Sequence, residues 1–237
     1  MKLAQNNPEE RLDAFSNNTS TFERHIHLSR YNYAANYINS VEPRSERMLI
    51  DAACGLGYGS YVLSTRTNAA VHGTDISHAA VRYATANYAL AEKITFTVCS
   101  ITQLPFDDNL FDFFICFETI EHLRKDDAVK ALTEMRRVLK SNGFLLISSP
   151  NRRMTRVFQL LFQTQNPFHL CEYTPRQLYD LITAHGFVLR QQLGQFLYLP
   201  LLSRLAIKVF PAVYLRPSTS LHPALCMIFL YSCQVRK

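Results

Sequence analysis

The sequence has no tryptophan, few glycines and, near its end, no acidic residue. The chain of 237 residues contains only seven glycines, and no Asp or Glu follows Asp180. Six of its 25 Lys and Arg residues lie beyond that point, so residues 1–180 hold 19 basic and 19 acidic residues. A neutral body with an entirely basic end indicates an anionic surface or substrate as a partner.

Paired cysteine motifs are absent as well. The six cysteines are scattered and none has C-x-x-C spacing; they lie at positions 54, 99, 116, 171, 226 and 233. Free thiols in a reducing cytoplasm explain this distribution better than disulfides do. The polar, acidic start over residues 1–10 does not fit a secretory signal peptide. We therefore expect a cytoplasmic protein.

No apolar run is long and uncharged enough to suggest a membrane span. The longest candidate, residues 196–215, is interrupted by Arg204, Lys208 and two prolines. Its spacing fits a lid helix on the domain or a helix lying on an anionic membrane, which would make the protein peripheral to it. The sequence also lacks the basic and aromatic stripe expected for nucleic acid, so no nucleic-acid partner is predicted. It leaves the oligomeric state open.

Short apolar runs alternate with helical patterns along most of the chain. The pattern predicts an α/β fold: a doubly wound, Rossmann-like, mostly parallel seven-stranded sheet with an antiparallel last strand and helices on both faces. Strands are expected at 48–53, 69–75, 94–98, 111–117, 144–149, 187–192 and 225–235, and helices at 22–39, 59–65, 77–92, 126–140 and 174–186. Residues 1–21 are interpreted as an N-terminal arm, and 22–237 as one domain with substrate-side insertions at 152–171 and 196–223.

Ligands of such sheets bind at the carboxyl ends of the strands. Three of the seven glycines, Gly55, Gly57 and Gly59, follow the first predicted strand. Glycines there allow the backbone to approach a ligand closely. The alternative interpretation is an ordinary strand-to-helix turn. Asp75 ends the second strand, where a carboxylate accepts hydrogen bonds from ribose hydroxyls. The alternative role for Asp75 is to cap the next helix, although Ser77 can do so.

The nucleoside cofactor suggested by these residues is S-adenosylmethionine or NAD. Asp51 lies directly before the glycines, and an acid there suits the sulfonium and ammonium groups of S-adenosylmethionine. A dinucleotide needs a helix N-terminus against its pyrophosphate. None of the twelve tyrosines has a lysine four residues on, so the Tyr-x-x-x-Lys pair of short-chain dehydrogenases is absent.

Further motifs follow in order: Leu104-Pro105-Phe106, Phe111-Asp112, Glu118-x-x-Glu121-His122, Arg137-x-Leu139-Lys140-x-x-Gly143 and Ser148-Ser149-Pro150-Asn151. With these, residues 24–195 resemble the class I S-adenosylmethionine-dependent methyltransferases of many bacterial genomes. Segments 30–35, 53–60 and 166–174 look most similar to members encoded with surface-polysaccharide genes. The fold alone does not assign the function.

The resemblance implies cofactor roles for ten residues. Asp51, Ala53, Gly55 and Gly57 would hold the methionine moiety, Asp75 the ribose, Ile76 the adenine face, and Ser100 with Ile101 the adenine edge. Many relatives have Asp where this chain has Ser100. Phe117 would face the methyl group or simply pack in the core, and Tyr31 would close over the cofactor or pack its helix.

Glu118, Glu121 and His122 follow the fourth predicted strand, where the acceptor should lie, and His169 lies beyond the fifth. This set is similar to the metal-binding residues of small-RNA 3′-terminal 2′-O-methyltransferases. Three interpretations stay open. Glu121 and His122 could bond backbone groups, His122 or His169 could act as a general base, or the set could hold a divalent ion.

The expected function is methyl transfer to an oxygen, less readily a nitrogen, of a small molecule, sugar or glycan. A quinone- or lipid-like acceptor at a membrane surface is the alternative enzyme. A non-catalytic cofactor-binding module of the same fold is the alternative outside enzymes.

Overall fold

The structure is a computed structural model that describes residues 11–16, 18–41, 46–90, 92–162, 167–197 and 216–237. The segment 198–215 therefore lies outside the described residues, and with it most of the apolar run. The proposed division into an arm and one domain stays a prediction.

Seven strands form one sheet in the order β3-β2-β1-β4-β5-β7-β6. They are β1 (Arg47–Ala52), β2 (Ala69–Asp75), β3 (Ile94–Val98), β4 (Phe111–Phe117), β5 (Leu139–Pro150), β6 (Phe187–Leu197) and β7 (Cys226–Val235). Strands β1 to β5 pair in parallel, and β7 runs antiparallel between β5 and β6. The predicted fold class is confirmed, including the antiparallel last strand.

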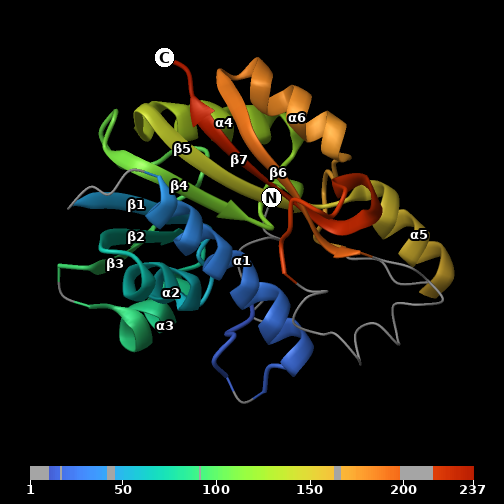
Figure 1. Ribbon diagram of the computed structural model, residues 1–237. Coiled ribbons are helices and arrows are strands. Elements are labelled where there is room, and N and C mark those ends of the chain that lie inside the picture. The colour runs from blue at the N-terminus through green and yellow to red at the C-terminus, as the bar shows by residue number, and fades with distance from the viewer. Residues whose placement is uncertain (1–10, 17, 42–45, 91, 163–166, 198–215) are drawn as a thin grey trace.

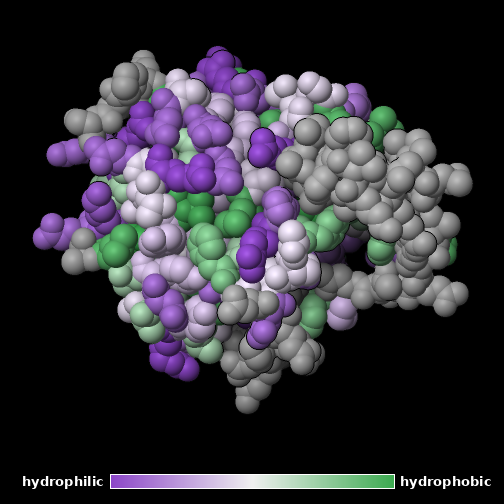
Figure 2. Space-filling view, turned by 60° about the horizontal axis from the view of Figure 1, so that its bottom comes forward, coloured by the Kyte–Doolittle hydropathy of each residue, from purple (hydrophilic) through white to green (hydrophobic). Residues whose placement is uncertain are grey.

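Helices cover both faces of the sheet (Figure 1). They are α1 (Thr21–Ser40), α2 (Tyr58–Arg66), α3 (His78–Tyr88), α4 (Lys125–Val138), α5 (Arg152–Phe162) and α6 (Pro175–Ala184), with short 3-10 helices η2 (Ile120–His122) and η3 (Pro223–Leu225). Helices α1 and α2 bury apolar side chains against one face, and α4 and α6 against the other. Hydrophilic residues prevail on the face shown in Figure 2, with hydrophobic ones in patches between them.

Side-chain caps set several helix starts. Ser20 and Glu23 form a capping box at α1, and Thr174 and Gln177 form another at α6. Ser77 caps α3 by accepting a hydrogen bond from the amide of Ala80, as the sequence predicts.

Three element predictions were wrong in their bounds. Helix α3 ends at Tyr88 instead of residue 92, and β6 extends to Leu197. The helix expected over 126–140, with Asn142-Gly143 as its stop, ends earlier: α4 ends at Val138, and the Asn-Gly pair lies inside β5. Asn142 has φ +66° there, and the pairing of β4 with β5 shifts register beside it. Asn tolerates this conformation, so an irregular strand produces the same signal as a helix end.

All six cysteines lie within the described residues and are free thiols, so the interpretation without disulfides is confirmed. None of the helices described has the length and hydrophobicity required to cross a membrane.

Candidate functional site

The loop after β1 turns by repeated use of left-handed backbone. Ala53, Gly55 and Gly57 have φ of +56°, +56° and +87°. A Cβ atom on Gly57 would lie 2.6 Å from that of Ala84 on α3, so the loop could not pack this closely with any other residue. The loop therefore presents backbone atoms at the carboxyl end of β1.

Gly59 has a different role from the two glycines before it. A Cβ atom there would lie 2.0 Å from Cζ of Tyr31, whose ring occupies that space. The Tyr31 hydroxyl donates to Oδ1 of Asp51 at 3.2 Å, and its ring packs edge-on against Phe117. Tyr31 is therefore packed beneath the loop in this structure, where it orients Asp51.

Asp51 is a buried acid beside the glycine loop. It is 1% exposed, and Ser60 donates to its Oδ2 at 2.7 Å. Burial raises the pKa of Asp51 to about 7, against the lowering effect of the hydrogen bonds from Ser60 and Tyr31. A cationic group arriving here would favour the ionised carboxylate.

Asp75 joins the glycine loop to the start of α3. Its Oδ2 accepts from the amide of Gly55 at 3.0 Å, and its Oδ1 accepts from the amide of Ser77 at 2.8 Å. Since Ser77 caps α3, Asp75 is not the helix cap. Its carboxylate lies at the end of β2, the position that a ribose contact requires.

Residues 11–16 supply a partner for Asp75 that the sequence did not reveal. Arg11 makes an ion pair with Asp75 at 3.0 Å. Asp13 accepts from the hydroxyls of Tyr83 and Tyr88 on α3 at distances of 2.7–2.9 Å. The segment 11–16 therefore lies over the predicted cofactor residues, and composition alone gave no signal of this contact.

The predicted adenine residues differ in exposure. Ile76, which follows Asp75, is 43% exposed and offers an apolar surface at the sheet edge. Ile101 is buried in the core under α4, and the Ser100 hydroxyl lies 2.8 Å from that of Thr102. The structure thus leaves Ile76 accessible and packs the Ile101 side chain inward.

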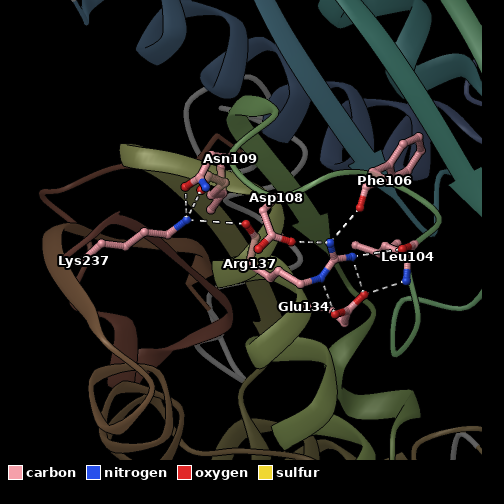
Figure 3. A network of polar contacts seen from close by, with 8 residues as sticks. Leu104, Phe106, Asp108, Asn109, Glu134, Arg137 and Lys237 are labelled. Carbon is pink, nitrogen blue, oxygen red and sulfur yellow. Dashed lines mark hydrogen bonds and ion pairs between the residues drawn. The ribbon is translucent and has the colours of Figure 1, made fainter.

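Beneath that edge, Leu104-Pro105-Phe106 is held by Arg137 of α4 (Figure 3). The guanidinium donates to the carbonyls of Phe106 at 2.7 Å and Leu104 at 3.0 Å, and it pairs with Glu134. Glu134 in turn accepts from the amide of Leu104 at 2.7 Å. These bonds fix the motif to α4, which is a structural role.

The chain leaves β4 through a strained residue. Glu118 has φ +50°, which is uncommon for a residue with a side chain and is found at functional sites. The Ser148 hydroxyl donates to its carboxylate at 2.6 Å. Phe117, directly before it, is 8% exposed and packs in the core cluster beside Tyr31.

Backbone bonds bring distant predicted residues together at η2. The carbonyl of Glu121 accepts from the amides of Leu170 at 2.8 Å and Cys171 at 2.9 Å. This places His169 beside His122, with ring centroids 5.1 Å apart. Glu121, His122 and His169 each offer one atom that can bind a metal, and these three atoms lie within 4.8 Å of one another. We call these three residues the Glu-His-His cluster.

The cluster has defined hydrogen-bond partners. His122 Nδ1 lies 3.1 Å from the carbonyl oxygen of Phe168, and His169 Nδ1 lies 2.8 Å from Oε1 of Glu172. The contact with Phe168 is a backbone contact of the kind that one of the three interpretations expects, although its partner lies 46 residues further along the chain. Neither the base nor the ion is excluded by it.

Glu121 is the buried acid of the cluster. It is fully buried, and within the part of the chain that the structure describes only one of its two carboxylate oxygens has a hydrogen-bond partner: Ser149 donates to Oε2 at 3.2 Å. Burial and the nearby Glu118 carboxylate raise the pKa of Glu121 well above its usual value.

Sequence reasoning missed two further residues near this region. Arg30 of α1 is 2% exposed and donates to Gln195 at 3.2 Å, and its Nε has no hydrogen-bond partner among the residues that the structure describes. Glu172 lies three residues after His169, a spacing that by itself assigns it no role. The folded chain shows that its carboxylate meets His169 Nδ1.

Comparison with known proteins agrees with this arrangement. The family described as "Methyltransferase domain" matches residues 50–147. A probable S-adenosylmethionine-dependent methyltransferase of Mycolicibacterium smegmatis is 31% identical over 151 residues, which are 63% of this chain and 55% of that protein. The chain thus spans about half the length of the curated relatives it matches.

Solved structures show the same fold at low identity. Magnesium protoporphyrin IX methyltransferase from Synechocystis, with bound SAH, has a TM-score of 0.64 and 15% identity, covering 93% of this chain and 90% of its own. The cyclase SpnF has a TM-score of 0.62 and 16% identity, covering 86% and 81%. Residues 50–147 are thus similar to a methyltransferase domain, and the chain shares the fold of these solved structures, one of which holds SAH.

Proposed function

We propose that this protein transfers a methyl group from S-adenosylmethionine to an oxygen, less readily a nitrogen, of a small molecule or sugar. The observation that carries the proposal is the position of the Glu-His-His cluster. It lies directly after β4, next along the sheet from the loop that follows β1. An acceptor between these places would have polar side chains on one side and the cofactor on the other.

The residues at the ends of β1 and β2 fit this cofactor. Asp75 would bind the ribose hydroxyls, and Asp51 with the loop 53–57 would hold the cationic methionine moiety. Ile76 is exposed where an adenine ring would pack. When bound, S-adenosylmethionine supplies a methyl group whose bond to sulfur breaks, the electron pair staying on sulfur, as the acceptor atom bonds to carbon.

The chain's own part is to align the acceptor and remove its proton. The acceptor hydroxyl would lie against the partly exposed His122 and His169, which lower the cost of losing that proton, with the buried Glu121 behind them. The carboxylate of Glu172 orients the His169 ring, and Thr155 donates to its other oxygen at 2.6 Å. His169 is therefore held in one orientation, as a catalytic group must be.

A sugar or glycan is the acceptor class we favour. This choice rests on the likeness of segment 166–174 to methyltransferases encoded with surface-polysaccharide genes. The same segment supplies His169 and Glu172, so the part of the chain that carries the likeness also forms the acceptor side of the site.

One observation favours a second candidate, a lipid-like acceptor at an anionic membrane. Helix α5 carries Arg152, Arg153 and Arg156, has no acidic residue and leaves Leu160 83% exposed. Basic residues beside an exposed apolar side chain are typical of helices that lie on membranes. Flotation with anionic liposomes tests this candidate: Leu160→Glu should weaken flotation, and a wild-type protein that never floats at low salt would rule it out.

The assay that tests the main proposal measures S-adenosylhomocysteine released with a panel of sugars and small hydroxyl compounds. We expect acceptor-dependent release, and turnover in His169→Ala that falls while cofactor affinity is retained. Cofactor binding without transfer to any acceptor would favour the non-catalytic module. Binding of NAD in place of S-adenosylhomocysteine would contradict the proposal.

A further inference from the structure

We propose that the Glu-His-His cluster binds a divalent transition-metal cation through Glu121, His122 and His169. The cation site stands on geometry alone, whereas its role, holding the acceptor oxygen, rests on the proposed function. Glu118, which belonged to the metal set considered from the sequence, is not part of the cluster; its carboxylate is bonded to Ser148.

The cluster is assembled by the backbone. Glu121 and His122 are neighbours in η2, and the same Glu121 carbonyl that accepts from Leu170 and Cys171 fixes the segment that carries His169. Three ligands from two segments are thus held together without help from an ion. Such preorganisation reduces the cost of assembling a metal site.

The partners of the two rings set their tautomers. The carbonyl of Phe168 can only accept, so His122 must carry its proton on Nδ1. Glu172 accepts from Thr155 through one oxygen and faces His169 Nδ1 with the other, so it can accept from that ring in the same way. When Nδ1 is the donor, Nε2 is the ring nitrogen that an imidazole offers to a metal.

This pattern is the usual environment of metal-binding histidines. Such rings donate their second N–H to a carboxylate or a backbone carbonyl, which fixes ring orientation and raises ligand basicity. The cluster has one partner of each kind, Glu172 and the Phe168 carbonyl. Two histidines that serve only to pack the core do not need a carboxylate and a carbonyl as hydrogen-bond partners.

Glu121 supplies the independent sign of a missing ligand. The residue is fully buried, and its Oε1 makes no hydrogen bond with any of the described residues. A buried polar atom without a partner is costly, and buried carboxylates are normally paired or coordinate a metal. A cation between Oε1 and the two imidazoles would satisfy it.

Ligand type and spacing narrow the kind of ion. Two imidazoles with one carboxylate suit Mn²⁺, Fe²⁺ or Zn²⁺ better than Mg²⁺ or Ca²⁺, which prefer oxygen. Ligands at about 2.1 Å from one ion lie at most about 4.2 Å apart. The cluster's donor atoms lie within 4.8 Å, so small side-chain rotations would suffice to close the site. Three protein ligands leave positions for acceptor oxygens.

The test titrates Mn²⁺ into protein freed of metal with a chelator, followed by electron paramagnetic resonance, with Zn²⁺ as competitor. We expect one saturable site that Zn²⁺ empties. His169→Ala and Glu121→Gln should abolish it, and Glu172→Gln should weaken it by about 10- to 100-fold. His185 provides the matched control. Its Nδ1 also meets a backbone carbonyl, that of Leu181 at 2.7 Å, and His185→Ala should keep the site.

Each variant is first checked for folding by circular dichroism, and His169→Ala serves if Glu121→Gln does not fold. No Mn²⁺ site in wild type, or an equal site in folded His169→Ala, overturns the inference. S-adenosylhomocysteine binding is measured separately on metal-free protein. Cofactor binding without a Mn²⁺ site would refute the cation alone, whereas absence of cofactor binding would refute the proposed function.

Discussion

At the residue scale, the two acids beside the glycine loop have different surroundings. Asp75 accepts from two backbone amides and pairs with Arg11, so its carboxylate is compensated by the chain itself. Asp51 receives only the hydroxyls of Ser60 and Tyr31 and is fully buried. The first is therefore suited to hydrogen-bond neutral hydroxyls, and the second to respond to a positive charge.

Replacing Asp75 tests the ribose contact. We expect Asp75→Ala to weaken S-adenosylhomocysteine binding by about 1–3 kcal/mol, because ribose hydroxyls lose their acceptor. Calorimetric titration measures this. Asp112→Ala is the control: Asp112 pairs with Lys140 and the amide of Met48 at the opposite end of the strands, so the variant should lose stability and keep affinity. Wild-type affinity in Asp75→Ala would show that Asp75 serves the loop alone.

Asp51 predicts how cofactor affinity depends on pH. Its pKa is about 7, so the protonated form persists below that pH, and an ammonium group of the ligand that approaches Asp51 must displace the proton. Affinity for S-adenosylhomocysteine should therefore rise between about pH 6 and pH 7, by at most about tenfold per pH unit, with proton release to the buffer. Calorimetry in buffers of different ionisation enthalpy measures the release.

Asp51 should affect the stability of the fold in the opposite direction: cofactor affinity rises with pH, whereas stability falls. The folded state holds this proton from the ordinary pKa of an Asp side chain up to a pKa of about 7, whereas the unfolded chain has already lost it. The contribution of Asp51 to stability therefore falls as pH rises through that window. Asp51→Asn should remove both effects. Equal proton release in wild type and Asp51→Asn would contradict the assignment.

At the scale of elements, the contact between α1 and the start of α2 depends on a missing side chain. Gly59→Ala would place a methyl group 2.0 Å from the Tyr31 ring and should lower the free energy of unfolding by about 1–3 kcal/mol. In a Tyr31→Ala background that clash is gone. We would measure the free energy of unfolding of wild type, Gly59→Ala, Tyr31→Ala and the double variant in denaturant. The losses in the two single variants should not add up in the double variant. Additive losses would mean that α1 and α2 move apart freely.

Helix α4 and the loop before β4 are joined by Arg137 (Figure 3). Arg137→Ala removes donors from the carbonyls of Leu104 and Phe106 and from Glu134, so we expect a loss of about 2–3 kcal/mol in denaturant unfolding. Lys130→Ala, in an exposed pair with Asp127, should change stability by under about 0.5 kcal/mol. Similar effects of the two changes would refute the network.

This network also predicts an acid dependence. Hydrogen bonds from Arg137 lower the pKa of Glu134, so its contribution is present above the ordinary Glu pKa and is lost as pH falls through the folded value. The difference between wild type and Glu134→Gln should accordingly shrink in acid. A difference that stays constant with pH would show that the charge of Glu134 contributes nothing.

The elements themselves were largely predictable, for physical reasons. Continuous apolar runs such as 111–117 gave β4 with its observed bounds, and Thr174-Pro175 gave the start of α6. Helix α5 was missed because residues 152–162 were assigned to an insertion. The end of α4 was misplaced because a bulged strand and a helix end both favour an Asn with positive φ, as Asn142 has.

At the scale of the molecule, the parts that prediction missed are contacts between distant segments. Arg11 meets Asp75 and Thr155 donates to Glu172, but no periodicity or spacing encodes either contact. The sequence could place Asp51, Asp75 and Glu118 at one sheet edge because parallel strands share their carboxyl ends. It could not say which partners would neutralise them. The basic, acid-free end is partly α6, β6 and β7, whose apolar residues complete the sheet and its core.

The central claim is that the loop after β1 and Asp75 hold S-adenosylmethionine, with its methyl group directed toward the Glu-His-His cluster. A crystal structure of the protein with S-adenosylhomocysteine tests it most directly. We predict ribose hydroxyls within hydrogen-bond distance of Asp75, adenine against Ile76, and the sulfur facing the end of β4. A ribose bound away from Asp75, or a sulfur directed away from Glu118 and His122, would contradict the account.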